Sequence, residues 1–86
     1  LLGKKSASER VATFLLDHRS RWEKLGGASV RIDLPMTRQD MGDYLGVTVE
    51  TVSRTLSGFA REGVLMLIPD GVRVLDLERL QAAAQG

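Results

Sequence analysis

Cysteine is absent from this chain of 86 residues, and the single histidine is His18. The lack of cysteine excludes a disulfide framework, a thiolate metal site and a cysteine nucleophile. One histidine cannot form a metal cluster, and neither a nucleophile–base pair nor a phosphate-binding glycine loop is apparent. We therefore expect no cofactor in this domain and regard an enzyme as the weakest interpretation.

Long apolar runs are absent too. No stretch could span a membrane and no signal-peptide pattern occurs, which favours a soluble cytoplasmic protein with no membrane partner. The length and a hydrophobic fraction of 43% predict one small folded domain over residues 1–86. Because the chain starts at Leu1 without an initiating Met, we expect it to be part of a longer protein.

A large excess of positive charge is also lacking, since 12 Lys and Arg residues are opposed by 11 Asp and Glu residues. Nucleic-acid-binding domains usually carry a basic patch, so charge alone does not predict DNA binding. The charge is uneven: six basic and three acidic residues occur in residues 1–25, but three basic and four acidic residues in residues 37–62. A DNA-binding domain of this charge would bind weakly as a monomer and would depend on dimerisation and specific contacts.

The first part of the chain predicts a helix followed by a strand. Ser6 and Glu9 have the spacing of a capping box, and a helix follows to about Lys24. Its apolar residues recur at helical spacing and are expected in the core: Val11, Phe14, Leu15, Trp22 and Leu25. Alternating residues then predict a strand over residues 28–36, closed by Pro35.

The stretch 37–62 predicts two short helices, over about residues 38–45 and 49–61, with Thr37 and Thr48 as their N-caps. The apolar residues of the two helices fall on inward faces. They are Met41 and Leu45 on the first helix, and Val52, Leu56, Phe59 and Ala60 on the second.

Three residues at the junction of these helices predict how they meet. Gly42 leaves room for a closely crossing helix, Gly46 allows the positive φ that reverses the chain, and Val47 fills the corner. A steep crossing over a short glycine-containing turn is typical of a helix-turn-helix unit.

The region after Gly63 predicts a β-hairpin and a last helix. An apolar run over residues 64–68 and a second strand over residues 72–75 flank a Pro-Asp-Gly turn, in which Gly71 is available for positive φ. Asp76 can cap the last helix. The fold class is therefore α+β, mainly α: a winged helix-turn-helix, a helix bundle with a small β-hairpin wing.

The outer face of the second helix is the candidate functional surface. Glu50, Ser53, Arg54 and Ser57 lie at i, i+3, i+4 and i+7 and form one polar stripe. Arginine can pair with guanine, glutamate can accept from cytosine N4, and serine can bond to several base edges, so the polar stripe suits the major groove of DNA. The alternative is a solvated face with a Glu50–Arg54 ion pair worth only about 0.3–0.5 kcal/mol.

Residues 34–65, LPMTRQDMGDYLGVTVETVSRTLSGFAREGVL, resemble the C-terminal DNA-binding domain of the bacterial Crp–Fnr transcription regulators. The resemblance covers essentially the whole chain. The triplet of Glu50, Ser53 and Arg54 is similar to the Fnr and FixK branch. The Crp branch tends instead to have arginine at the position of Val49 and glycine at that of Ser53.

The resemblance implies specific DNA contacts. Arg54 would recognise the guanine of a TTGAT half-site, Glu50 would accept from the paired cytosine, and Ser53 would help to select the outer T·A pairs. Other residues would contact phosphates and set the register on the duplex. These are Thr37, Arg38, Gln39, Thr48, Thr51 and Ser57.

The resemblance also implies partners. The sensor domain and the dimerisation helix of the family are absent from this chain, so we expect a homodimer on a near-palindromic operator only in the full-length protein. An upstream sensor of oxygen, redox state or a small ligand would control binding, and RNA polymerase is a further candidate partner. Activation and repression both stay open. The rival interpretation is a winged-helix protein-interaction module without DNA affinity, which the near-neutral charge favours.

Overall fold

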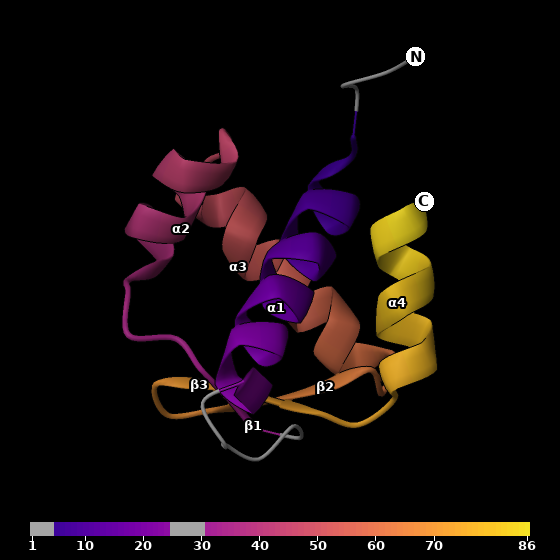
Figure 1. Ribbon diagram of the computed structural model, residues 1–86. Helices are drawn as coiled ribbons and strands as arrows, with labels where there is room; N and C mark the ends of the chain where they lie inside the picture. The colour runs from indigo at the N-terminus through magenta and orange to yellow at the C-terminus, as the bar shows by residue number, and fades with distance from the viewer. Residues whose placement is uncertain (1–4, 25–30) are drawn as a thin grey trace.

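The computed structural model describes the backbone of residues 5–24 and 31–86, and the side chains of all of these except residues 20–24 (Figure 1). The elements in that part follow the predicted order of helix, strand, two helices, hairpin and helix. They are α1 (Ala7–Lys24), β1 (Arg31–Asp33), α2 (Arg38–Leu45), α3 (Val49–Arg61), β2 (Leu65–Ile68), β3 (Gly71–Val74) and α4 (Leu77–Gln85). The side chain of Trp22 and the whole of Leu25, both predicted in the core, lie outside the described residues.

The helices begin at hydrogen-bonding caps that were predicted from the sequence. The Thr37 hydroxyl accepts from the backbone N–H of Asp40 at 3.0 Å, and the Asp40 carboxylate accepts from the backbone N–H of Thr37 at 3.2 Å. The hydroxyl of Thr48 accepts from the N–H of Thr51 at 3.1 Å and so caps α3. These bonds satisfy helix N–H groups that have no partner within the helix.

The cap of α1 depends on the charge of one carboxylate, Glu9. The backbone N–H of Ser6 donates to the Glu9 carboxylate at 2.7 Å, and the Ser6 hydroxyl accepts from the N–H of Glu9 at 3.2 Å. The hydrogen bonds from Ser6, with the backbone bond as the larger cause, lower the pKa of Glu9. The contribution of these hydrogen bonds to the free energy of unfolding is complete above the ordinary pKa of a glutamate. It is lost as the pH falls through the lowered pKa of Glu9.

The junction of α2 and α3 depends on two glycines, as predicted. Gly46 has a φ of 75°, and its N–H donates to the carbonyl of Gly42 at 2.8 Å. A Cβ placed on Gly42 would lie only 2.7 Å from the carbonyl oxygen of Val47, so the chain after α2 passes directly over this position. Val47 is half-buried and packs against the core.

The predicted wing is part of a three-stranded antiparallel sheet of order β1-β3-β2. The hairpin prediction is confirmed, but the sequence did not indicate that β1 pairs with β3. The strand predicted over residues 28–36 was too long at its C-terminal end, because pairing stops at Asp33 and Pro35 has no N–H to extend it. Residues 28–30 lie outside the described residues.

The hairpin turn corrects another prediction. The positive φ belongs to Asp70, at 60°, and not to Gly71. Pro69 fixes the first turn position, and aspartate tolerates the left-handed conformation at the second. Gly71 instead begins β3, where a Cβ would clash with the carbonyl oxygen of Ile32 on β1. Glycine is therefore needed at position 71 so that β1 can approach β3 closely.

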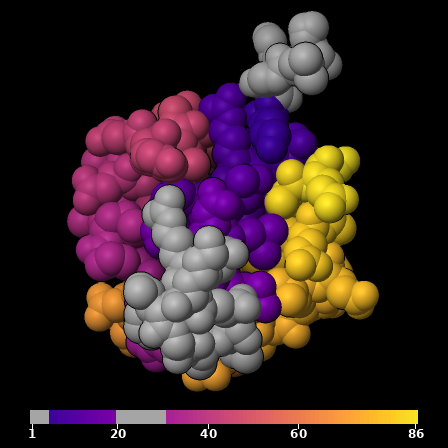
Figure 2. Space-filling view, viewed as in Figure 1, coloured from indigo at the N-terminus to yellow at the C-terminus, as the bar shows by residue number. Residues whose placement is uncertain are grey.

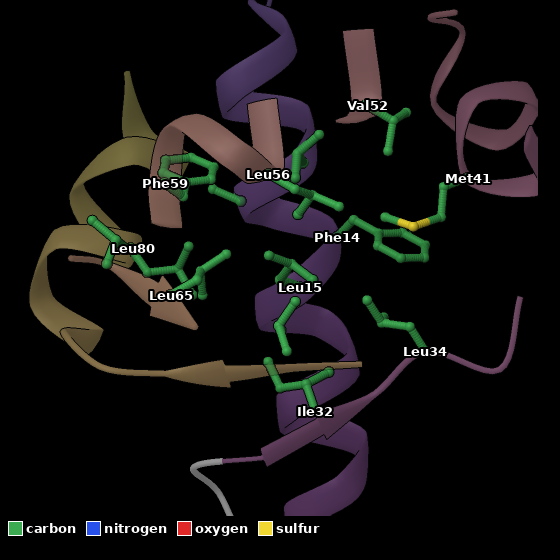
Figure 3. Packing of buried hydrophobic residues seen from close by; sticks show 14 residues of the cluster. Phe14, Leu15, Ile32, Leu34, Met41, Val52, Leu56, Phe59, Leu65 and Leu80 are labelled. Carbon is green, nitrogen blue, oxygen red and sulfur yellow. The ribbon is translucent and has the colours of Figure 1, made fainter. Parts of the chain in front are cut away.

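The core lies between α1, α3 and the sheet, and the labelled side chains in Figure 3 point into this shared space. Every predicted apolar residue of α1 whose side chain is described is buried there, as are Met41 on α2 and Val52, Leu56 and Phe59 on α3. Ala60, the fourth predicted inward residue of α3, is only half-buried and lies outside this cluster. The buried core residues are Val11, Ala12, Phe14, Leu15, Ile32, Leu34, Met41, Val52, Leu56, Phe59, Val64, Leu65, Val72 and Leu80. Leu45 is only partly buried.

Helix α1 lies between α2 and α4 on the face seen in Figure 2, and α3 runs behind it in Figure 1. Two arginines connect these helices by hydrogen bonds to main-chain carbonyls. Arg10 donates to the carbonyl of Leu45 at the end of α2 at 3.0 Å. Arg79 of α4 donates to the carbonyl of Glu62 at the end of α3 at 2.7 Å. Among the described residues, no helix is long and apolar enough to cross a membrane.

Replacing Gly42 by alanine tests the close contact between α2 and the turn that precedes α3. We expect Gly42→Ala to lower the free energy of unfolding by about 1–3 kcal/mol, because the new methyl group would press on a backbone carbonyl. Gly58→Ala in α3 is the matched control, since its Cβ would meet nothing within 4 Å. The control should raise stability by about 0.5–1 kcal/mol. Urea unfolding followed by circular dichroism measures the free energy of unfolding of both variants. If the two substitutions changed it equally, the backbone contact at Gly42 would not be tight.

The cap of α3 makes a second stability prediction. Thr48→Ala should lower the free energy of unfolding by about 1 kcal/mol, because the N–H of Thr51 loses its acceptor. Thr48→Ser keeps the hydroxyl and should stay close to the parent protein. Thermal unfolding of the three proteins at one pH distinguishes the outcomes. A Thr48→Ala protein as stable as the parent would show that water replaces this cap without cost.

Candidate DNA-binding interface

The polar stripe of α3 faces outward along its whole length. Glu50, Arg54 and Ser57 are exposed, and Ser53 is half-buried. The opposite side of the helix is buried in the core through Val52, Leu56 and Phe59. The packing of the apolar side therefore fixes the rotation of α3 and turns a carboxylate, a hydroxyl and a guanidinium to the same side of the molecule.

The ion pair that would explain the polar stripe as an ordinary solvated surface does not form within the described part of the chain. Between side chains described there, ion pairs join Arg31 to Asp33 and Arg79 to Glu62. Glu50 and Arg54 thus keep their acceptor and donor groups available to a ligand. A guanidinium has five N–H donors in a planar fork, which suits the two acceptors on the major-groove edge of guanine.

The start of α2 meets the polar stripe at one point. Arg38, the first residue of α2, donates from Nη1 to the Ser53 hydroxyl at 3.2 Å. The sequence predicts Arg38 as a phosphate contact and Ser53 as a base contact, but it does not indicate that the two side chains bond to each other. No spacing rule connects residues of different helices that lie fifteen positions apart.

Thr37 and Gln39, the other predicted phosphate contacts at the start of α2, differ in their hydrogen-bond partners. The Thr37 hydroxyl accepts from Asp40 but keeps its own proton for an external acceptor. The Gln39 side chain donates to the Asp43 carboxylate at 3.0 Å, on its own helix. This bond uses one of the two N–H donors of the amide and leaves the other for a phosphate.

The start of α3 presents a chain of two hydroxyls. The Thr48 hydroxyl donates to the Thr51 hydroxyl at 2.9 Å, which leaves the Thr51 proton free to reach an external acceptor. Thr48 is exposed and Thr51 is half-buried. Both lie at the positive end of the α3 macrodipole, where anions are favoured. Ser57 lies two turns further along the helix.

Two residues that support the ends of α2 and α3 could not be identified from the sequence. They are Arg10 and Arg79, which bond to the carbonyls at the ends of α2 and α3. Their partners lie 35 and 17 residues away in the chain, respectively, so no local pattern could have identified them. Cations at helix C-termini are favourable partners of the macrodipole.

Comparisons with known proteins agree with this geometry. Residues 9–83 match the Crp-like helix-turn-helix domain family. The chain is 51% identical over 84 residues to the transcriptional activatory protein AadR of Rhodopseudomonas palustris, covering 98% of this chain and 35% of AadR. It is also 51% identical over 84 residues to the nitrogen fixation regulation protein FixK of Bradyrhizobium diazoefficiens, with the same coverage.

A solved structure supports the same assignment. The structure of FixK2 from Bradyrhizobium japonicum superimposes with a TM-score of 0.82 at 43% identity, covering 96% of this chain and 40% of that one. The chain spans about a third of the length of the curated relatives. AadR and FixK are named as regulators rather than enzymes, which agrees with the prediction for this chain. The chain therefore belongs to the Crp-like helix-turn-helix domains, on the FixK and Fnr branch of the Crp–Fnr transcription regulators.

Proposed function

We propose that this domain binds double-stranded DNA sequence-specifically by inserting α3 into the major groove. The observation that carries the proposal is the outward polar stripe, whose Glu50 and Arg54 form no ion pair with each other among the described residues. A helix with free hydrogen-bonding groups near its N-terminus has the shape and chemistry that the major groove accepts. The regulator names of AadR and FixK support the same function.

Each residue of the triplet has a distinct role in this proposal. Arg54 pairs with N7 and O6 of the guanine in a TTGAT-like half-site. Glu50 accepts from N4 of the cytosine paired with that guanine. Ser53 bonds to the outer T·A pairs. The opposite charges of Glu50 and Arg54 match the donor and acceptor presented by one G·C pair.

Phosphate contacts from the starts of α2 and α3 set the register of the domain. Arg38 contributes charge, and the uncharged contacts are Thr37 and Gln39 on α2, Thr48 and Thr51 at the start of α3, and Ser57 further along α3. Because the donors are mostly uncharged, they orient the domain more than they attract it to DNA.

In the full-length protein, two copies would present α3 to successive major grooves about 34 Å apart on a near-palindromic site. Two weak domains on one site gain affinity because the second binds intramolecularly. An upstream sensor of oxygen, redox state or a small ligand would shift the population towards the spacing that fits DNA. RNA polymerase is a further proposed partner once the regulator is bound.

Substituting Arg54 tests the proposed base contact. Arg54→Ala should weaken binding to a duplex with two inverted TTGAT half-sites by about 1–3 kcal/mol and relax the preference at one base pair. Arg54→Lys is the control for charge, since it keeps the cation but loses the two-pronged donor geometry. Fluorescence anisotropy with duplexes substituted at each position measures both. Unchanged affinity and base preference in Arg54→Ala would refute the assignment.

Salt dependence separates DNA binding from the protein-interaction alternative. If Arg38 and Arg54 supply the charge at the DNA, the logarithm of the binding constant should fall with the logarithm of salt with a slope of roughly −1 to −3 per domain. A protein-interaction module would show no affinity for the duplex even at low salt. A titration of the same duplex over a range of salt concentrations decides between the two functions.

A further inference from the structure

The hydrogen bond between Arg38 and Ser53 links the residue that opens α2 to the middle of the polar stripe. We infer that Arg38 is a positioning residue for base recognition: its guanidinium makes the Ser53 hydroxyl a donor towards DNA and so selects base acceptors at that position. This inference rests on the proposed function, because it requires α3 to lie in the major groove.

A serine hydroxyl alone is a poor discriminator between bases. It carries one O–H donor and two acceptor lone pairs, so it can bond to base donors and base acceptors alike. In this structure Nη1 of Arg38 donates to Oγ of Ser53 at 3.2 Å. One lone pair is thereby occupied, while the hydroxyl proton stays free to point outward.

The charge on Arg38 strengthens this bias. A hydrogen bond from a cation is stronger than a neutral one and polarises the hydroxyl that accepts it, which improves that hydroxyl as a donor. In the major groove, acceptors are thymine O4, adenine N7 and guanine N7 and O6. Adenine also presents a donor at N6, whereas cytosine presents only a donor, at N4. Ser53 held in this way should favour a T·A pair over one that places cytosine opposite the hydroxyl.

Arg38 can hold Ser53 and a phosphate together. The bond to Ser53 uses one of its five N–H donors, and the residue is exposed. Asp70 lines the same cavity of about 170 Å³ beside the hairpin turn, yet within the described residues it forms no ion pair with Arg38. The guanidinium therefore bridges the backbone contact that sets register and the hydroxyl that selects a base.

Gln39 provides a matched comparison on the same helix. It is exposed and is also proposed to contact phosphate, but its side chain donates to Asp43 of α2. It has no bond to the polar stripe among the described residues. Loss of Gln39 should therefore lower affinity for all sequences alike, without changing base preference.

A double-mutant cycle tests the inference. Parent protein, Arg38→Ala, Ser53→Ala and the double variant are titrated by anisotropy against the duplex with two inverted TTGAT half-sites. Further duplexes replace the outer T·A pairs by each other base pair. Ser53→Ala should reduce the discrimination against cytosine at those pairs by roughly two- to tenfold, the worth of one hydrogen bond. Arg38→Ala should lower affinity for every duplex and reduce the same discrimination, and the double variant should discriminate no worse than Ser53→Ala.

Two controls separate positioning from charge and from folding. Arg38→Lys keeps the positive charge but loses the planar set of donors of the guanidinium. Compared with Arg38→Ala, it should therefore recover affinity for all duplexes more than it recovers the discrimination against cytosine at the outer pairs. Gln39→Ala should leave discrimination unchanged. All variants should keep the unfolding midpoint of the parent, since the substituted side chains lie outside the core.

The outcomes are distinguishable from failure of the proposed function. If Arg38→Ala lowers affinity for all duplexes by one common factor, or if the parent shows no preference at the outer pairs, Arg38 is a phosphate contact only and the inference is wrong. If the parent binds no duplex at low salt, the proposed function itself fails. Reduced discrimination in Arg38→Ala that vanishes in the Ser53→Ala background supports the inference.

Discussion

The close contact between Gly42 of α2 and the turn that leads into α3 is the constraint on which the rest of the interface depends. The carbonyl of Val47 lies so close to Gly42 that a single added carbon would meet it at 2.7 Å. This contact, together with the left-handed Gly46, fixes where α3 begins relative to α2. The Arg38–Ser53 bond is possible only because the two helices are held in this relation. Geometry at a buried glycine thus decides which polar groups can cooperate on the surface.

Some of the positive charges of the chain already have partners within the protein. Arg10 and Arg79 bond to main-chain carbonyls, and Arg31 pairs with Asp33. Arg10 and Arg79 connect helices to one another, whereas Arg31 bonds to a neighbour on its own strand, and none of the three belongs to the polar stripe. In the proposed binding mode these three arginines add little attraction to the phosphate backbone, so the free energy of specific binding depends more on base contacts and on a second copy of the domain. Near-neutral charge is consistent with a domain whose sequence preference matters more than its general affinity.

The sequence predicted those features that depend on neighbours in the chain. The bounds of α2 and α3, their threonine caps and the outward direction of the polar stripe follow from local periodicity and short-range hydrogen bonds. The pairing of β1 with β3 could not be predicted, because the register depends on residues about forty positions apart. The assignment of positive φ to Gly71 was wrong for a related reason. Glycine was required there by the close carbonyl of Ile32 on another strand, and aspartate was left to adopt the turn conformation.

The same distinction applies to the candidate site and explains why a residue-by-residue description of it is incomplete. A spacing pattern can assign Ser53 to one face of a helix, but it cannot say whether the hydroxyl donates or accepts. That property is set by its neighbour in space, here a guanidinium from the preceding helix. A regulator could therefore change its preferred base without any substitution in the polar stripe, if the residue at the start of α2 changes. In the proposed binding mode, specificity belongs to a pair of helices and not to α3 alone.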